Sequence, residues 1–261
     1  MASLSDQRET LGHLSLLAVQ DITDLWRDAS MLDLDSRSFR GVIRQGVPEL
    51  IDPYAATAGD LAAAWYNEAA PELAYRATPA ALPPKEQLTV SSAWALYSDG
   101  KAALARLSGL AQRTIFNAQR ETIVGNVRME TGARWARHAS ANACPFCKMM
   151  ATRGAVYSTE GAATTVGSER WEPKRNSKGQ RVGGDVGRRA RSRGSQDPGD
   201  RYHDHCRCMA VEVRPGRSYE PPPYVEEWEQ QYIDAVRATP GVGEYGAIDV
   251  KAVLAHMAKN G

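Results

Sequence analysis

Residues 144–147 read Cys-Pro-Phe-Cys, and residues 202–208 read Tyr-His-Asp-His-Cys-Arg-Cys. A Cys-x-x-Cys pair places two thiolates on one tight turn, where both can face a single ion. A later His-x-x-Cys adds the imidazole and thiolate donors that tetrahedral zinc prefers. The spacing therefore predicts a structural zinc site, whose candidate ligands are Cys144, Cys147, His203, Cys206 and Cys208.

Five donors compete for four positions at such a site, and His205 lies beside them. The spacing alone leaves open which of His203, His205 and Cys208 completes the metal site. The alternative is that the cysteines form two pairs, thiol or oxidised, within a small core.

The rest of the sequence favours the metal over disulfides. Four cysteines are too few to staple 261 residues as a disulfide scaffold. The N-terminus has no basic region followed by an apolar one, so we expect no signal peptide and a reducing cytosol.

The longest apolar run, residues 61–66, is far shorter than the ~20 residues that a membrane span needs, so no membrane segment is expected.

Charge is strongly segregated along the chain, although the formal net charge is only +1. Residues 1–100 carry 7 basic and 14 acidic side chains, and residues 101–220 carry 22 and 11. Residues 221–261 return to an excess of acid, with 3 basic and 6 acidic side chains. The middle of the chain is therefore suited to a polyanion and the two ends are not.

The excess of basic charge is densest in a glycine-rich insert, residues 158–202. Such a segment is typical of an arm that contacts DNA phosphates without reading bases. The alternative is a solvated loop. The candidate phosphate-binding residues are Arg170, Lys174, Arg175, Lys178, Arg181, Arg188, Arg189, Arg191 and Arg193.

Hydrophobic periodicity predicts helices over most of the first half of the chain. The second of them is expected to end before Pro48, and a third to begin at Asp52-Pro53 and run to about residue 70. One long helix or two stacked helices are expected over 91–124. Short strands are expected at 133–138, 154–157 and 208–213, followed by helices at 224–238 and 249–259.

These elements predict a mainly helical α+β protein in three parts. Residues 1–90 form an acidic helical region, and residues 91–220 form a small zinc-stabilised α+β module that carries the basic insert. Residues 221–261 form a helical tail. Because the N-terminal region is acidic and amphipathic, we expect it to dock on a protein, with Trp65 and Tyr66 either anchoring in a partner's pocket or filling the core.

The order of motifs over about residues 90–214 resembles the phage Mu F-like minor head protein family. A helix containing Asn117, Gln119 and Arg120 is followed by Trp135, then by Cys144-x-x-Cys147, and finally by His203-x-x-Cys206-x-Cys208. The long basic insert departs from the family's pattern.

The resemblance implies a minor capsid protein of a tailed bacteriophage, located in the virion head interior or at the portal vertex and in the host cytoplasm during assembly. Its implied partners are the portal protein, the major capsid protein and packaged DNA, and no catalytic residue is assigned. A head maturation protease is one alternative. A zinc-dependent nuclease, suggested by His203-Asp204-His205, is another, but it would need a second Cys-x-x-Cys that the sequence lacks.

Overall fold

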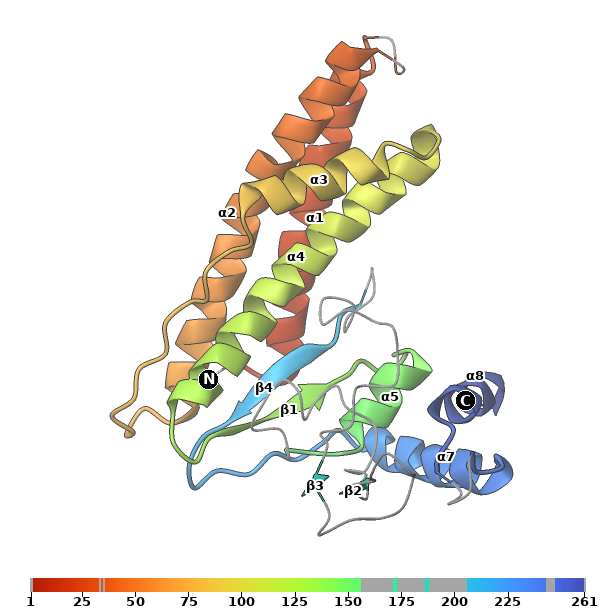
Figure 1. The fold of residues 1–261 in the computed structure, drawn as a ribbon. Helices are drawn as coiled ribbons and strands as arrows, with labels where there is room; N and C mark the ends of the chain where they lie inside the picture. Colours follow the sequence, from red (N-terminus) through yellow and green to blue (C-terminus); the bar gives the residue numbers. More distant parts are fainter. Residues whose placement is uncertain are drawn as a thin grey trace.

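The computed structural model describes residues 2–32, 34, 36–155, 206–242 and 247–260, with two short strands at 171–172 and 186–187. The fold is mainly helical, and its described part holds seven helices and two small two-stranded sheets (Figure 1). The elements are α1 (Leu4–Ala29), α2 (Arg37–Ala69), α3 (Lys85–Ala95), α4 (Gly100–Met129), β1 (Arg134–His138), α5 (Pro145–Ala151), β2 (Trp171–Glu172), β3 (Val186–Gly187), β4 (Met209–Val213), α7 (Tyr224–Ala238) and α8 (Val250–Asn260).

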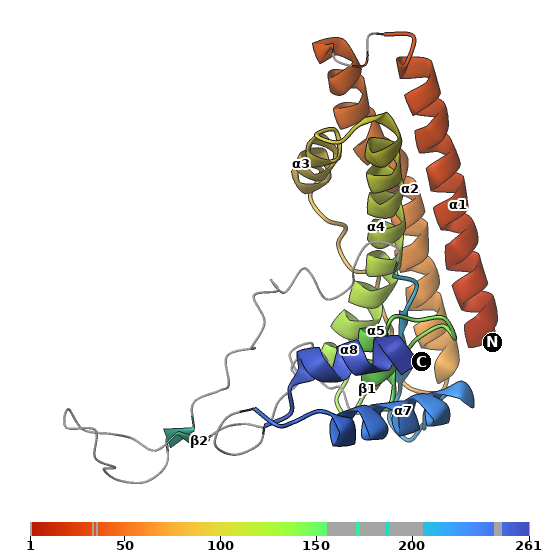
Figure 2. The same ribbon diagram turned by 90° about the vertical axis from the view of Figure 1, so that its right-hand side faces the viewer.

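The helices α1, α2 and α4 form an elongated bundle, with α3 crossing α2 and α4 (Figures 1 and 2). Their core consists of apolar side chains at helical spacing, among them Leu11, Ile22 and Ile43, and Leu107 and Ile115 of α4. Because α4 packs on both N-terminal helices, residues on the two sides of position 90 share one hydrophobic core. The domain boundary at residue 90 stays a prediction.

The prediction of two separate helices around Pro48 and Pro53 is wrong, because α2 is continuous through both prolines. Its buried residues recur every three or four positions along the whole length, including Ile43, Val47 and Ile51. Packing of this stripe against α1 and α4 compensates for the backbone hydrogen bonds that the two prolines cannot donate.

Farther along the chain, the sequence left a choice between one helix and two over 91–124, and the structure has two, α3 and α4. Asp99 separates them, because its side chain caps α4 by accepting a hydrogen bond from the backbone N–H of Ala102.

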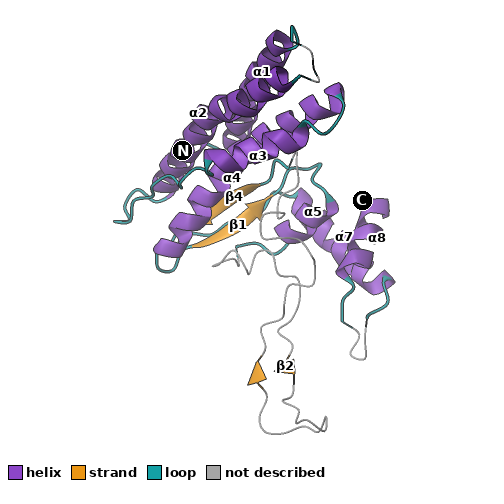
Figure 3. Ribbon diagram, turned by 45° about the horizontal axis from the view of Figure 1, so that its top comes forward, coloured by secondary structure: helices purple, strands orange, loops and turns teal. Residues whose placement is uncertain are grey.

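The sheet of β1 and β4 lies beside the lower part of α4 and joins segments far apart in sequence (Figures 1 and 3). Strands β1 and β4 pair antiparallel, with Arg134 opposite Val213 and His138 opposite Met209. They confirm the strands predicted at 133–138 and 208–213. Of the strand predicted at 154–157, residues 154 and 155 lie in no strand, and the other two are outside the described residues. Helix α5 packs between β1 and the C-terminal pair α7 and α8.

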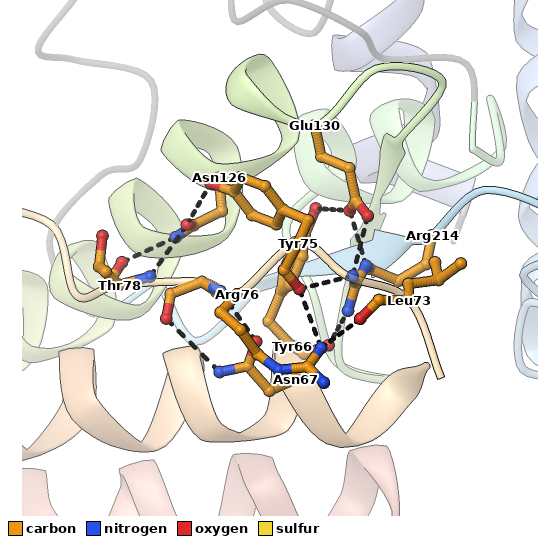
Figure 4. Close-up of polar contacts among 10 residues, drawn as sticks. Tyr66, Asn67, Leu73, Tyr75, Arg76, Thr78, Asn126, Glu130 and Arg214 are labelled. Carbon is orange, nitrogen blue, oxygen red and sulfur yellow. Dashed lines mark hydrogen bonds and ion pairs between the residues drawn. The ribbon is translucent and has the colours of Figure 1, made fainter. Parts of the chain in front are cut away.

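A buried ion pair fastens the sheet to the bundle (Figure 4). The guanidinium of Arg214, just after β4, donates to both carboxylate oxygens of Glu130 at 2.6 and 2.8 Å. It also donates to the carbonyl oxygens of Tyr66 and Tyr75. The Tyr66 hydroxyl donates to Glu130 at 2.6 Å, and burial together with this bond raises the pKa of Tyr66 above its ordinary value. The phenol therefore stays protonated as a donor.

None of the described helices combines the length and the hydropathy needed to cross a bilayer.

Candidate metal centre

The first cysteine pair is presented by the start of α5. Cys144 is the residue that precedes the helix, Pro145 occupies its first turn, and Cys147 lies three residues after Cys144. Residues three apart are neighbours on one side of a helix, so both sulfurs reach the same space. Cys147 is buried, and Cys144 is partly exposed.

The second pair is presented by the extended segment that leads into β4. Alternate residues of an extended chain face the same side, and Cys206 and Cys208 are both buried while Arg207 between them is exposed. The first two cysteines are three residues apart at the start of α5, and the second two are two residues apart in an extended segment before β4. Each pair therefore faces one side of its element, and the two pairs lie next to each other.

The sulfurs lie at distances that suit a metal ion. The Sγ atoms of Cys147, Cys206 and Cys208 are all within 4.8 Å of one another, and those of Cys147 and Cys206 are 3.7 Å apart. Four sulfurs around zinc, at Zn–S distances of about 2.3 Å, are separated by roughly 3.8 Å. None of the four cysteines is in a disulfide. These three buried cysteines can hold a metal ion.

Cys144 lines the same cleft as these three cysteines, at the edge of the group of close sulfurs. The hydrogen bonds of Cys147 with Cys144, Cys206 and Cys208 raise the pKa of the Cys147 thiol. The bonds from Cys147 and Cys208 to Cys206, with the charge of Arg120 adding to them, lower the pKa of the Cys206 thiol. The cluster thus favours a thiolate at one sulfur before any metal binds.

Side chains of α4 hold the second pair in place. Arg120 donates to the carbonyl oxygens of Cys208 at 2.7 Å and Cys206 at 2.8 Å, and to Asn117 Oδ1 at 2.8 Å. Gln119 donates from Nε2 to the carbonyl of Ala210 at 2.6 Å. Asn117, Gln119 and Arg120 are part of the family resemblance in the sequence, but no contact between them and the cysteines was predicted.

A second arginine lies against the first pair. Arg137 of β1 is 1% exposed, and its Nη1 donates to Cys147 Sγ at 3.6 Å. Its guanidinium also lies over the Phe146 ring, 5.6 Å from the centroid. The cluster is therefore bordered by two buried cations, and neither was identified as a site residue from the sequence.

One side of the cluster opens on a cleft of about 670 Å³ between α1 and the loop before α5. Arg8, Glu9 and His13 of α1 line the cleft opposite the cysteines.

The remaining candidates lie outside the described residues. These are the histidines His203 and His205 and the nine basic residues of the insert, Arg170, Lys174, Arg175, Lys178, Arg181, Arg188, Arg189, Arg191 and Arg193. Their roles stay predictions.

Comparison with known proteins gives one result. The model of a family described as VG15 protein matches residues 1–235, which include the bundle, the cysteine cluster and most of α7. No curated protein and no solved structure matches the chain. The match does not name the Mu F-like family, so that narrower assignment stays a prediction.

Proposed function

The chain belongs to the VG15 protein family, a family of phage proteins, and we propose that it is a structural minor head protein of a tailed bacteriophage. In this role it associates with the portal or the inner capsid face and contacts packaged DNA during head assembly and genome delivery. The observation that carries the proposal is the phage-family match across nearly the whole chain. It is supported by the packing of α4, β1, α5 and β4, which carry the Mu F-like motifs, around one cysteine cluster.

The composition of the virus particle tests this proposal directly. Quantitative mass spectrometry of virions from the encoding phage should detect the chain at a small fraction of the abundance of the major capsid protein. A nonsense mutation in its gene should leave heads that lack the chain and deliver DNA poorly. Absence of the chain from both heads and mature virions would refute a role as a head protein.

We propose zinc as the metal, with a structural role. Thiolate ligands select soft or borderline ions, and zinc in structural sites is four-coordinate and tetrahedral. The centre joins α5 to the segment before β4 and so ties together parts of the module that are far apart in sequence. Zinc would supply cross-linking there rather than chemistry.

The basic insert is proposed as the DNA contact, and the salt dependence of binding tests it. Each phosphate that a protein neutralises contributes about −0.9 to the slope of log affinity against log salt. Replacing Arg188, Arg189, Arg191 and Arg193 with alanine should therefore flatten the slope by roughly 3–4 units. The measurement is a fluorescence-anisotropy titration of duplex DNA at several salt concentrations.

The matched control for this arm is replacement of the same four arginines by lysine, which keeps the charge and should keep the slope. An alanine variant with an unchanged slope would mean that the arm does not touch DNA. Cleavage of the duplex on adding divalent metal would instead favour the nuclease alternative.

The N-terminal region is proposed to hold the portal or capsid partner. Trp65 and Tyr66 belong to the core, because they are 6% and 0% exposed, so neither is free to anchor in a partner's pocket. Apolar side chains do reach the surface where α1 turns into α2, including Met31, which is 90% exposed, and Leu32. Exposed apolar side chains of this kind suit a protein partner better than DNA.

We expect Met31→Asp with Leu32→Asp in the full-length chain to reduce capture of co-expressed portal protein at least tenfold, because the charges oppose burial of this turn. Val242→Asp with Ile248→Asp is the matched control, since both residues are exposed apolar side chains in the C-terminal region. If only the variant with Val242→Asp and Ile248→Asp fails to capture the portal protein, the docking surface lies in the C-terminal tail instead.

A further inference from the structure

We infer that the metal centre is all-thiolate, with Cys144, Cys147, Cys206 and Cys208 as its four ligands and the buried guanidinium of Arg137 as a cation that stabilises it. This inference rests on the proposed metal centre and deepens it, because it selects one ligand set among those that the sequence left open. It also assigns a positioning and electrostatic role to Arg137.

Among the residues that the structure describes, the ligand atoms that gather here are all cysteine sulfurs. Cys147, Cys206 and Cys208 have mutually close Sγ atoms, and Cys144, which precedes α5, lines the same cleft as these three. The backbone of the second pair is held by Arg120 from a different element, so α4 helps to position Cys206 and Cys208. Four thiolates complete a tetrahedral site, and a histidine would be a fifth donor.

The charges around the cluster favour the same ligand set. Four thiolates and one zinc ion leave two net negative charges, whereas three thiolates with one neutral imidazole leave one. A buried cation is costly unless an anion lies near it. Arg137 points a guanidinium N–H at Cys147 Sγ, and Arg120 lies against the carbonyls of the other pair, so two cations border an anionic centre.

The Arg137 contact has a direct chemical consequence. An N–H donated to a thiolate ligand offsets part of the negative charge on sulfur and so stabilises an anionic metal centre. The same guanidinium packs over Phe146, which lies between the two cysteines of the first pair. Arg137 therefore fixes the position of that pair as well as its charge.

Cobalt(II) substitution of the full-length protein counts the ligands. The near-ultraviolet sulfur-to-cobalt charge-transfer band grows with each thiolate, so Cys144→Ser should lower its intensity by about a quarter, as one of four ligands is lost. His203→Ala and His205→Ala, each made separately, should leave the band unchanged. A full band in Cys144→Ser, or a changed spectrum in either histidine variant, would overturn the all-thiolate assignment.

The role of Arg137 is tested by zinc affinity in a competition with a chromophoric chelator. Arg137→Gln, which removes the charge, should weaken zinc binding by about 10–100-fold, and Arg137→Lys should recover part of the loss. Arg134→Gln is the matched control, since Arg134 lies on the same strand but is exposed. Unchanged affinity in Arg137→Gln, or no recovery in Arg137→Lys, would overturn the role of the charge.

Failure of the inference is distinguishable from failure of the proposed centre. A wild-type protein that binds neither zinc nor cobalt would refute the metal centre itself. A wild-type protein that binds metal with a spectrum altered by loss of a histidine would keep the centre and refute only the all-thiolate ligand set.

Discussion

Cys147→Ser is expected to lose the metal and to unfold the module around it, while α1 and α2 keep their structure. Cys147 is the buried sulfur that contacts both the other thiol of its own pair and the two thiols that precede β4. Structural zinc in small modules contributes an apparent binding free energy of about 10–16 kcal/mol, which is as large as the usual stability of an entire domain, about 5–15 kcal/mol. Loss of the ion should therefore separate α5 from β4.

The measurement combines elemental analysis of protein purified without chelator with thermal unfolding followed by circular dichroism. The variant should contain no zinc and should show an early transition for the module, followed by a later one for the bundle. Wild-type protein treated with chelator is the control, because it should reproduce the early transition and recover when zinc is returned. Zinc content and unfolding equal to those of the wild type would contradict the prediction.

A second large effect is expected from Glu130→Gln, which should lower the free energy of unfolding by about 3–5 kcal/mol. The substitution leaves the Arg214 guanidinium buried without its charged partner, at a position where Arg214 is 1% exposed (Figure 4). It also weakens the bond that the Tyr66 hydroxyl donates to the same carboxylate. Urea unfolding at neutral pH, with a fixed zinc concentration, measures the change.

A neighbouring ion pair provides the matched control. Arg217 and Glu72 also join the segment after β4 to the loop after α2, at 2.7 Å, but both side chains are more than half exposed. Glu72→Gln should change stability little, because solvent screens an exposed pair. The double variant Glu130→Met with Arg214→Met should be less destabilised than the sum of its single changes. If Glu130→Gln and Glu72→Gln lower the free energy of unfolding equally, burial of the ion pair does not determine its contribution to stability.

The sequence predicted most of the elements because their signals are local. Apolar residues at helical spacing predicted the helices, and the alternation of residues between two faces predicted the strands that are β1 and β4 in the structure. The wrong prediction of a break in the helix at Pro48 and Pro53 also came from a local signal. Proline lowers the local preference for helix, whereas the continuity of α2 depends on its burial against α1 and α4.

In the candidate site, too, local spacing predicted some residues, and only the tertiary structure identified the others. Residue type and spacing selected Cys144, Cys147, His203, Cys206 and Cys208 as candidate ligands, since cysteines two or three residues apart share a face of a strand or helix, and left the choice among His203, His205 and Cys208 open. Nothing local identified Arg137 or Arg120 as neighbours of the sulfurs. Arg120 is separated by 86 and 88 residues from the two cysteines whose carbonyls it binds.

The sequence by itself therefore determined the helical class, the positions of β1 and β4 and a set of candidate ligands that includes the four cysteines, because each depends on residues within a few positions of one another. Only the tertiary structure decided which cations border the cluster, that Trp65 and Tyr66 lie in the core, and that Arg214 pairs with Glu130 across 84 residues. Those contacts form when distant segments pack, and packing depends on the shape and charge of the whole chain rather than on any local period.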